Sequence, residues 1–432
     1  MKKIFILSAL FFTFVSSYAH DGEIHKYIVF RAYQMLEIRY IEAGGNPQDL
    51  QEIRSKIINT DGTQCNLDND NNHPIVKGSF QEDKTDPIYF KWDDAATFTH
   101  FWKADDGDYQ KNWIVFPNAL MKTYAYLFSN GGIYRWTVFL KNREGGESTY
   151  EYLQNSDLIQ FYLTGSCKRI YYNVVLWTKI YHGDFQTVVY PEAKRLSYEI
   201  LGRTAHLLAD MSIPAHVHID SHPADFGDAD EYEYNYMRDV ADSLFADPEN
   251  LVNDDGFMPY LVEQNNRTFI RTLFYTMNQV TSHFSSNDKD GNNNVSNATM
   301  LIDQKLNAWG AAETKPTKDV LNTATKTFNF CVGATATLFY WFGINTGMLK
   351  TKIKDQYFNT PIPNPTLLIY SDNSINLQPG FEFSGKEMLL MTGNATGGGR
   401  RNVPQEIDLL PDAPFMVDSI MHNIPCDTIY IN

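Results

Sequence analysis

The sequence predicts a mostly α-helical protein, a multi-helix domain followed by a small β-rich C-terminal domain. Long segments up to residue 344 carry apolar residues at helical spacing, whereas short alternating runs begin near residue 359. The 432 residues are 43% hydrophobic and 14% aromatic, which is enough to build a real core. The formal net charge of -16 argues against a general affinity for nucleic acid or anionic membranes, because attraction to phosphate needs basic charge.

Residues 1–19 have the pattern of a signal peptide. Two lysines precede an apolar run over residues 4–15, and this run is too short to span a membrane as a mature helix. Small residues, Ser17 and Ala19, stand at the expected cleavage site. We therefore expect a secreted protein, extracellular or at the cell surface, whose mature chain begins at His20 and has no transmembrane segment.

Helical spacing of apolar residues recurs from the N-terminal region to residue 344. The segments predicted to be helical are 25–42, 113–128, 149–163, 168–181, 191–210, 234–246, 259–285, 299–312 and 317–344. The aromatic residues at about 104–190 are interpreted as packing within an insertion in the main domain, which covers residues 20–358.

Turn-forming residues fill the segment 44–77. Within it Asp68, Asp70 and Asn72 alternate like part of a calcium loop. His73 occupies the position that such a loop reserves for glycine, and no distal glutamate fits the pattern. We therefore interpret this segment as an ordinary loop.

The chain changes character at about residue 359. Pro361, Pro363 and Pro365 indicate a stiff linker. Short runs beyond it predict strands, and these are 367–370, 374–377, 387–391, 415–420 and 428–431. Residues 359–432 are therefore predicted to form the linker and the β-rich domain.

The four cysteines, Cys65, Cys167, Cys331 and Cys426, are scattered without a CxxC pair. Their spacing argues against a cysteine zinc site, while export would permit disulfides. Three pairings of four cysteines are possible, and the sequence leaves them open.

The stretch 201–236 carries the densest set of metal-ligand residue types. His206 and Asp210 are four residues apart and so share one face of a predicted helix. Pro214 cannot continue that helix, and His216 follows it. A histidine and an aspartate at this spacing often make only a local pair, so this stretch alone does not establish a metal site.

Further ligand types lie upstream. After cleavage His20 would carry a free α-amino group, whose pKa of about 8 allows it to lose a proton and coordinate a metal. His25 follows near the start of the first helix, and Asp83 and His100 lie in segments bounded by turns. Imidazole and carboxylate groups are the ligands that zinc takes in proteins.

Taken in order, these residues resemble the zinc-dependent phospholipase C/P1-type nuclease superfamily over roughly residues 20–345. The most specific part is His206-x3-Asp210-x3-Pro214-Ala215-His216, which resembles the family's HxxxDxxxPxH segment. Gly78-x4-Asp83 and Thr99-His100-Phe101 resemble the family's upstream aspartate and SHF-type histidine. The resemblance implies a mostly helical domain that holds three zinc ions in a cleft.

The resemblance also implies which residues bind the three ions. The ligands would be His20, His25 and Asp210 for the first ion, Asp83, His100, His206 and a bridging Asp210 for the second, and His216, Asp230 and Glu233 for the third. Asp83 would in addition be catalytic, because it would orient the attacking water or take its proton. In the family the third ion is held by a second histidine and a glutamate four residues later, whereas Asp230 and Glu233 are three residues apart. Members of this third set can therefore be replaced by Asp228, Glu231, His218 or His222.

The function implied is that of an exported, phospholipase C-like phosphodiester hydrolase that cleaves phospholipid head groups with metal-activated water at a membrane surface. The phospholipases begin with tryptophan, where this chain would begin with His20. The Gly-Gly-Asn segment of the nuclease branch is absent after His216, which favours the phospholipase branch. One alternative is a P1-type nuclease or other phosphodiesterase acting on nucleic acid. Another is a surface binding protein with a degenerate metal site, which the β-rich tail favours.

Overall fold

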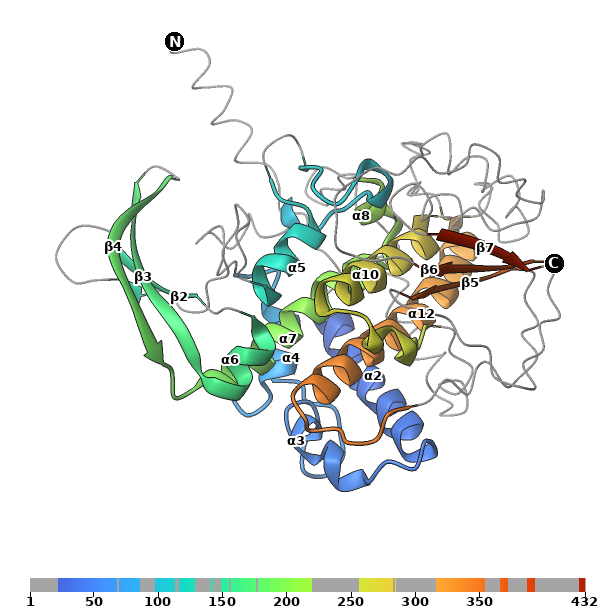
Figure 1. Cartoon of the computed structure of the whole chain (residues 1–432), viewed down its shortest axis with the longest axis horizontal. Coiled ribbons are helices and arrows are strands. Elements are labelled where there is room, and N and C mark those ends of the chain that lie inside the picture. The colour runs from blue at the N-terminus through green and yellow to red at the C-terminus, as the bar shows by residue number, and fades with distance from the viewer. Residues whose placement is uncertain are drawn as a thin grey trace, which may run out of the picture. The chain divides into compact units, whose positions relative to one another are not determined.

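The computed structural model describes most of the helical region and, near the C-terminus, the residues of three strands. The described residues are 22–67, 70–85, 98–112, 116–128, 141–142, 149–154, 157–175, 178–219, 256–282, 284, 316–353, 366–371, 387–392 and 427–431. The chain divides into two compact units, the first formed by residues 1–258 and 274–351 and the second by residues 259–273 and 352–432. The described structure is mostly helical, as the sequence predicts (Figure 1). The domain boundaries set from sequence stay predictions.

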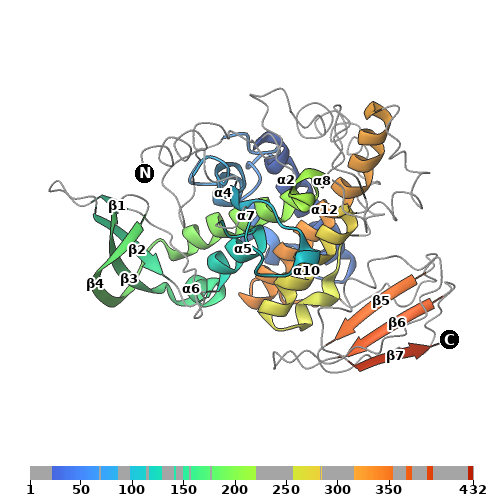
Figure 2. The same ribbon diagram turned by 90° about the horizontal axis from the view of Figure 1, so that it is seen from above.

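The core of the first unit is built around α7 (Ala193–Asp210), which packs against α2 (Gly22–Glu42), α4 (Pro74–Gln81), α5 (Ala119–Leu127) and α12 (Pro316–Asn345). Both views show α7 running beside α4 and α5 (Figures 1 and 2). Nearly every residue of α7 from its second turn onward is buried. Polar side chains on such a helix must therefore find partners inside the protein, because an unpaired buried polar group is costly.

Two glycines let α4 and α7 approach until their backbones touch. A Cβ atom on Gly78 would lie 2.0 Å from the carbonyl oxygen of Glu199, and a Cβ atom on Gly202 would lie 2.0 Å from that of Ile75. No side chain fits at either crossing point. The close contact fixes the end of α4, and therefore Asp83 just beyond it, against the middle of α7.

The end of α7 follows the sequence prediction. The helix ends at Asp210, and Pro214 is the first residue of the short helix α8 (Pro214–His218), a position where proline costs no hydrogen bond. The remaining short helices are η1 (Pro47–Leu50), α3 (Gln51–Arg54), η3 (Ala104–Asp106), α6 (Leu158–Thr164) and η7 (Pro259–Glu263). The helix predicted over 259–285 is η7 followed by α10 (Asn266–Ser282).

A four-stranded antiparallel sheet corrects two helix predictions. Its strands, in spatial order, are β1 (Lys141–Asn142), β2 (Thr149–Gln154), β3 (Ser166–Val175) and β4 (Thr178–Val189). The helix predicted over 168–181 is therefore wrong, and the one predicted over 149–163 is a strand followed by α6. Tyrosine, valine, isoleucine and threonine dominate these runs, and they favour a pleated strand over a helix. The helices predicted over 234–246 and 299–312 lie outside the described residues.

The second unit contains a three-stranded sheet. Strand β6 (Glu387–Thr392) pairs in parallel with β5 (Thr366–Ser371) and antiparallel with β7 (Asp427–Ile431). Strands are thus present in three of the five predicted runs, and the runs 374–377 and 415–420 lie outside the described residues. Among the helices that the structure describes, none combines the length and apolar character needed to cross a membrane.

Candidate metal centre

Five of the metal-ligand residues predicted from sequence meet inside the first unit. They come from α2 (His25), the turn after α4 (Asp83), the segment before η3 (His100) and α7 (His206 and Asp210). We call these five residues the central cluster. Four are at most 1% exposed, and Asp83 is the most exposed at 9%.

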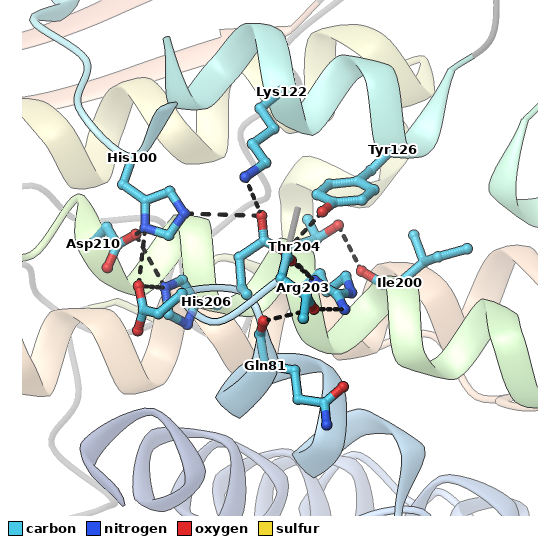
Figure 3. A network of polar contacts seen from close by, with 12 residues as sticks. Gln81, His100, Lys122, Tyr126, Ile200, Arg203, Thr204, His206 and Asp210 are labelled. Atoms are coloured by element: carbon cyan, nitrogen blue, oxygen red, sulfur yellow. Dashed lines mark hydrogen bonds and ion pairs between the residues drawn. The ribbon is translucent and has the colours of Figure 1, made fainter. Parts of the chain in front are cut away.

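Four side chains of the central cluster face one another at short range. Nδ1 of His100 lies 3.0 Å from Oδ2 of Asp210 and 3.3 Å from Oδ1 of Asp83. Nε2 of His206 lies 3.2 Å from the same Asp83 oxygen and 3.4 Å from Oδ2 of Asp210. Figure 3 shows His100, His206 and Asp210 converging in this way. Two atoms bound at about 2.0–2.1 Å to one tetrahedral zinc ion are about 3.3–3.4 Å apart, and these four histidine–carboxylate distances are close to that spacing.

Asp210 also faces a second group. Its other oxygen, Oδ1, lies 3.5 Å from Nε2 of His25. The ring of His25 stacks on that of His206, with centroids 3.6 Å apart. The ligand atoms therefore form two overlapping groups, one of His25, His206 and Asp210 and one of Asp83, His100 and His206. Because one oxygen of Asp210 faces His25 and the other faces His100 and His206, this carboxylate can bridge two cations.

The facing atoms lack the hydrogen bonds that burial normally demands. Within the described structure, both oxygens of Asp210, Oδ1 of Asp83, Nε2 of His206 and Nδ1 of His100 make no aligned hydrogen bond. Leaving such atoms unsatisfied costs free energy, and most buried polar atoms in proteins do have a partner. A bound cation would satisfy these atoms together, so the side chains present fit a metal ion.

The protonation of His206 is set from outside the central cluster. Its Nδ1 atom lies 2.6 Å from the carbonyl oxygen of Ser79, which can only accept a hydrogen bond. Nδ1 therefore carries the proton and donates it to Ser79, while Nε2 is directed at Asp83 and Asp210. Metal-binding histidines commonly use their second nitrogen in this way.

The electrostatics of the metal-free cluster favour protonated histidines. Burial acts to lower the pKa of His206, but Asp83 and Asp210 outweigh it and raise the pKa to about 9. Burial likewise opposes a charge on His100, yet Asp210 and then Asp83 raise its pKa. Burial would raise the pKa of Asp83, but His206 and His100 hold it well below its usual range. A divalent cation can take the place of these protons, because it supplies the same positive charge.

Sequence reasoning missed a buried charged network directly behind His100. Glu82, wholly buried, lies next to Lys122 of α5 and Arg203 of α7, and it also accepts a hydrogen bond from Tyr126. Burial would raise the pKa of Glu82, but Lys122 and Arg203 outweigh it and hold the pKa below its usual value. The available signal was a lone lysine inside the otherwise uncharged run of residues 119–127.

Of the remaining predicted ligands, His216 is among the described residues and is not joined to the central cluster. His216 lies on α8, where its ring stacks on Phe101 with centroids 4.3 Å apart, and none of the ligand groups among the described residues includes it. His20, Asp230 and Glu233 lie outside the described residues. The predicted third ion therefore stays a prediction, as does the contribution of the chain terminus to the first.

A second group of ligand types lies in the predicted loop. Cys65, Asp70 and His73 place ligand atoms within 4.8 Å of one another, and we call them the loop group. Oδ2 of Asp70 lies 2.6 Å from Nδ1 of His73, and Nε2 of His73 lies 3.2 Å from the carbonyl oxygen of Ile58. Each ring nitrogen of His73 thus lies within hydrogen-bond distance of an oxygen of the protein.

Comparison with known proteins adds no relative: no family model, no curated protein and no solved structure matches this chain. Any function for the chain therefore rests on the geometry of the central cluster and on its order of residues.

Proposed function

We propose that the chain is a zinc-dependent phosphodiester hydrolase of the phospholipase C type, with the central cluster as its metal centre. The observation that carries the proposal is a set of four ligand atoms from Asp83, His100, His206 and Asp210, in which each histidine nitrogen lies 3.0–3.4 Å from both carboxylates. They are buried and lack aligned hydrogen bonds within the described structure. Imidazole nitrogens with carboxylate oxygens, and no thiolate, form a ligand set that suits zinc.

The resemblance of the residue order supports the phosphodiesterase assignment. The segment His206-x3-Asp210-x3-Pro214-Ala215-His216 covers the last turn of α7 and the start of α8, and the histidine and aspartate of its first half face into the central cluster. Zinc bound there would neutralise the charge of a phosphodiester and lower the pKa of a water molecule. Asp210 would bridge two ions, since Oδ1 faces His25 while Oδ2 faces His100.

Asp83 is the residue we assign to proton handling. It is 9% exposed, whereas the other members of the central cluster are at most 1% exposed, so water can reach the cluster most readily at this carboxylate. There Asp83 would orient the attacking water and accept its proton. Phospholipid head groups are the proposed substrate class, and export to the cell surface or beyond would bring the protein to them.

A second candidate, a binding protein whose metal ion is structural, is favoured by one observation. Structural zinc sites are closed, whereas catalytic sites keep a position open to water or substrate. The near-complete burial of His25, His100, His206 and Asp210 is typical of the closed kind. In this case the ion would hold α2, α4 and α7 together without taking part in a reaction.

One experiment separates these functions. The purified chain is analysed for zinc and is then incubated with phosphatidylcholine vesicles or single-stranded DNA, each with and without a chelator. We expect bound zinc and chelator-sensitive release of the phosphorylated head group. Cleavage of DNA alone would indicate the nuclease branch. Bound zinc without hydrolysis of either substrate would support the structural role and overturn the hydrolase proposal.

A further inference from the structure

The buried charged network around Glu82 faces one of the proposed metal ligands, His100. Oε1 of Glu82 lies 2.6 Å from Nζ of Lys122 and 3.9 Å from Nε2 of His100. Its other oxygen, Oε2, accepts from Nη1 of Arg203 at 2.7 Å and from the hydroxyl of Tyr126 at 2.7 Å. Lys122 and Tyr126 approach from α5 on the same side of Arg203 (Figure 3). Three donors from α5 and α7 therefore hold this carboxylate, and Nε2 of His100 faces it from a distance longer than a hydrogen bond.

The two ring nitrogens of His100 face different groups, one the central cluster and the other the network around Glu82. Nδ1 faces Asp83 and Asp210, while Nε2 faces Glu82. An imidazole that binds a metal through one nitrogen commonly passes the proton of the other to a carboxylate, which fixes the orientation and tautomer of the ring. Glu82 occupies the position of that carboxylate.

Arg203 ties the same network to Asp83. Arg203 binds Glu82, which precedes Asp83 in the chain. It also donates to Thr85, which follows Asp83, through the carbonyl oxygen at 2.8 Å and the hydroxyl at 3.0 Å. Arg203 precedes His206 by three residues on α7. One guanidinium group thus holds both flanks of Asp83 against the helix that carries two of the other ligands.

We propose that Glu82 is a positioning residue of the metal centre: it accepts the Nε2 proton of His100, so that the lone pair of Nδ1 faces the cation. Lys122, Arg203 and Tyr126 hold the Glu82 carboxylate in place for this purpose. This inference rests on the proposed function, because it assigns Glu82 to the same zinc site.

A double variant, E82Q/K122M, tests the inference against K122M as its matched control. Removal of Lys122 together with the carboxylate avoids leaving an unpaired buried charge, which would be strongly destabilising by itself. The oxygen of the introduced amide would face Arg203 and Tyr126, and the amide nitrogen would donate to Nε2 of His100. The ring proton would then move to Nδ1, where it blocks metal binding. We expect the double variant to bind zinc about 10–100 times more weakly than K122M in a competition titration. Equal affinities in two folded proteins would overturn the inference.

A measurement on the unaltered chain covers the case in which the double variant does not fold. Nitrogen-15 labelled histidine, observed by NMR in the zinc-loaded protein, reports which ring nitrogen of His100 carries a proton. We expect the proton on Nε2, protected from exchange with water. A proton on Nδ1 instead would overturn the inference while zinc binding, and with it the proposed metal centre, would stand. Failure of the unaltered chain to bind zinc would overturn both.

Discussion

The central cluster and the loop group both place histidine beside aspartate but differ in what these polar atoms contact. In the loop group the imidazole of His73 and the carboxylate of Asp70 are 2.6 Å apart, a hydrogen-bond distance. In the central cluster the corresponding atoms are 3.0–3.5 Å apart and are not aligned as hydrogen bonds. The loop pair satisfies itself, whereas the cluster needs a further partner.

The two groups also differ in burial, which decides whether water can satisfy their polar atoms. The side chains of His73 and Asp70 are 12% and 13% exposed, so water can reach them. Those of His100, His206 and Asp210 are fully buried. A polar atom near the surface can exchange one partner for water, but a buried one cannot. Spacing and burial, rather than residue type, therefore distinguish a metal site from a local ion pair.

The largest effect is expected for Asp210→Asn. The amide keeps the shape of the side chain but removes the charge that faces His25 on one side and His100 on the other. We expect zinc binding to weaken by more than about 100-fold, beyond the range caused by loss of an outer partner, and hydrolysis to fall below detection. Zinc analysis and the vesicle assay measure the two effects. A variant with full zinc content and full activity would contradict the site.

A second prediction concerns pH. In the metal-free chain the pKa of His206 is raised to about 9, so zinc must displace a proton below that pH. Zinc affinity should therefore rise with pH up to about 9 and then level off. Calorimetric titration in buffers of different ionisation enthalpy counts the protons released. A constant affinity across this range, without proton release, would be inconsistent with His206 as a ligand.

The same shift affects the stability of the metal-free chain. The folded pKa of His206 lies above the ordinary histidine value of about 6.5, so the protonated ring stabilises the fold fully below that pH. The contribution is lost as the pH rises through about 9. Denaturation of chelator-treated protein should show this loss, and zinc-loaded protein should not, because its ring carries no such proton.

An intermediate effect is expected for Gly78→Ala. The added methyl group would lie 2.0 Å from the carbonyl oxygen of Glu199 and would push α4 away from α7. We expect a loss of about 1–3 kcal/mol in the free energy of unfolding, together with weaker zinc binding, because Asp83 would move. Gly44→Ala is the control, since its φ of 82° is unfavourable for alanine but no atom lies within 4 Å of the added carbon. The control should lose stability and keep its zinc affinity; equal zinc loss in both would show that the α4–α7 contact does not position the site.

The smallest effect is expected for Asp70→Asn in the loop group. A backbone hydrogen bond from Asn72, and then the contact with His73, lower the pKa of Asp70. Its contribution to stability is therefore present above the ordinary aspartate pKa of about 3.9 and is lost as the pH falls below it. We expect a cost of less than about 1 kcal/mol at neutral pH and no change in zinc content. Loss of zinc in this variant would reverse the comparison between the two groups.

The sequence predicts the parts of the site that depend on local pattern. The four-residue spacing of His206 and Asp210 places both on one face of a helix, and α2, α7 and α12 form where helices are predicted. The network around Glu82 is not predictable from sequence, because its members meet only through tertiary packing. The strands at 166–189 are not predicted, because over a short segment the same aromatic residues fit the helical period of 3.6 and the strand period of 2.

The most direct test is a crystal structure of the zinc-loaded chain with anomalous scattering recorded at the zinc absorption edge. We predict an anomalous peak about 2.0–2.2 Å from the facing atoms of Asp83, His100, His206 and Asp210. A peak at Cys65, Asp70 and His73 with none among those four residues would contradict the account.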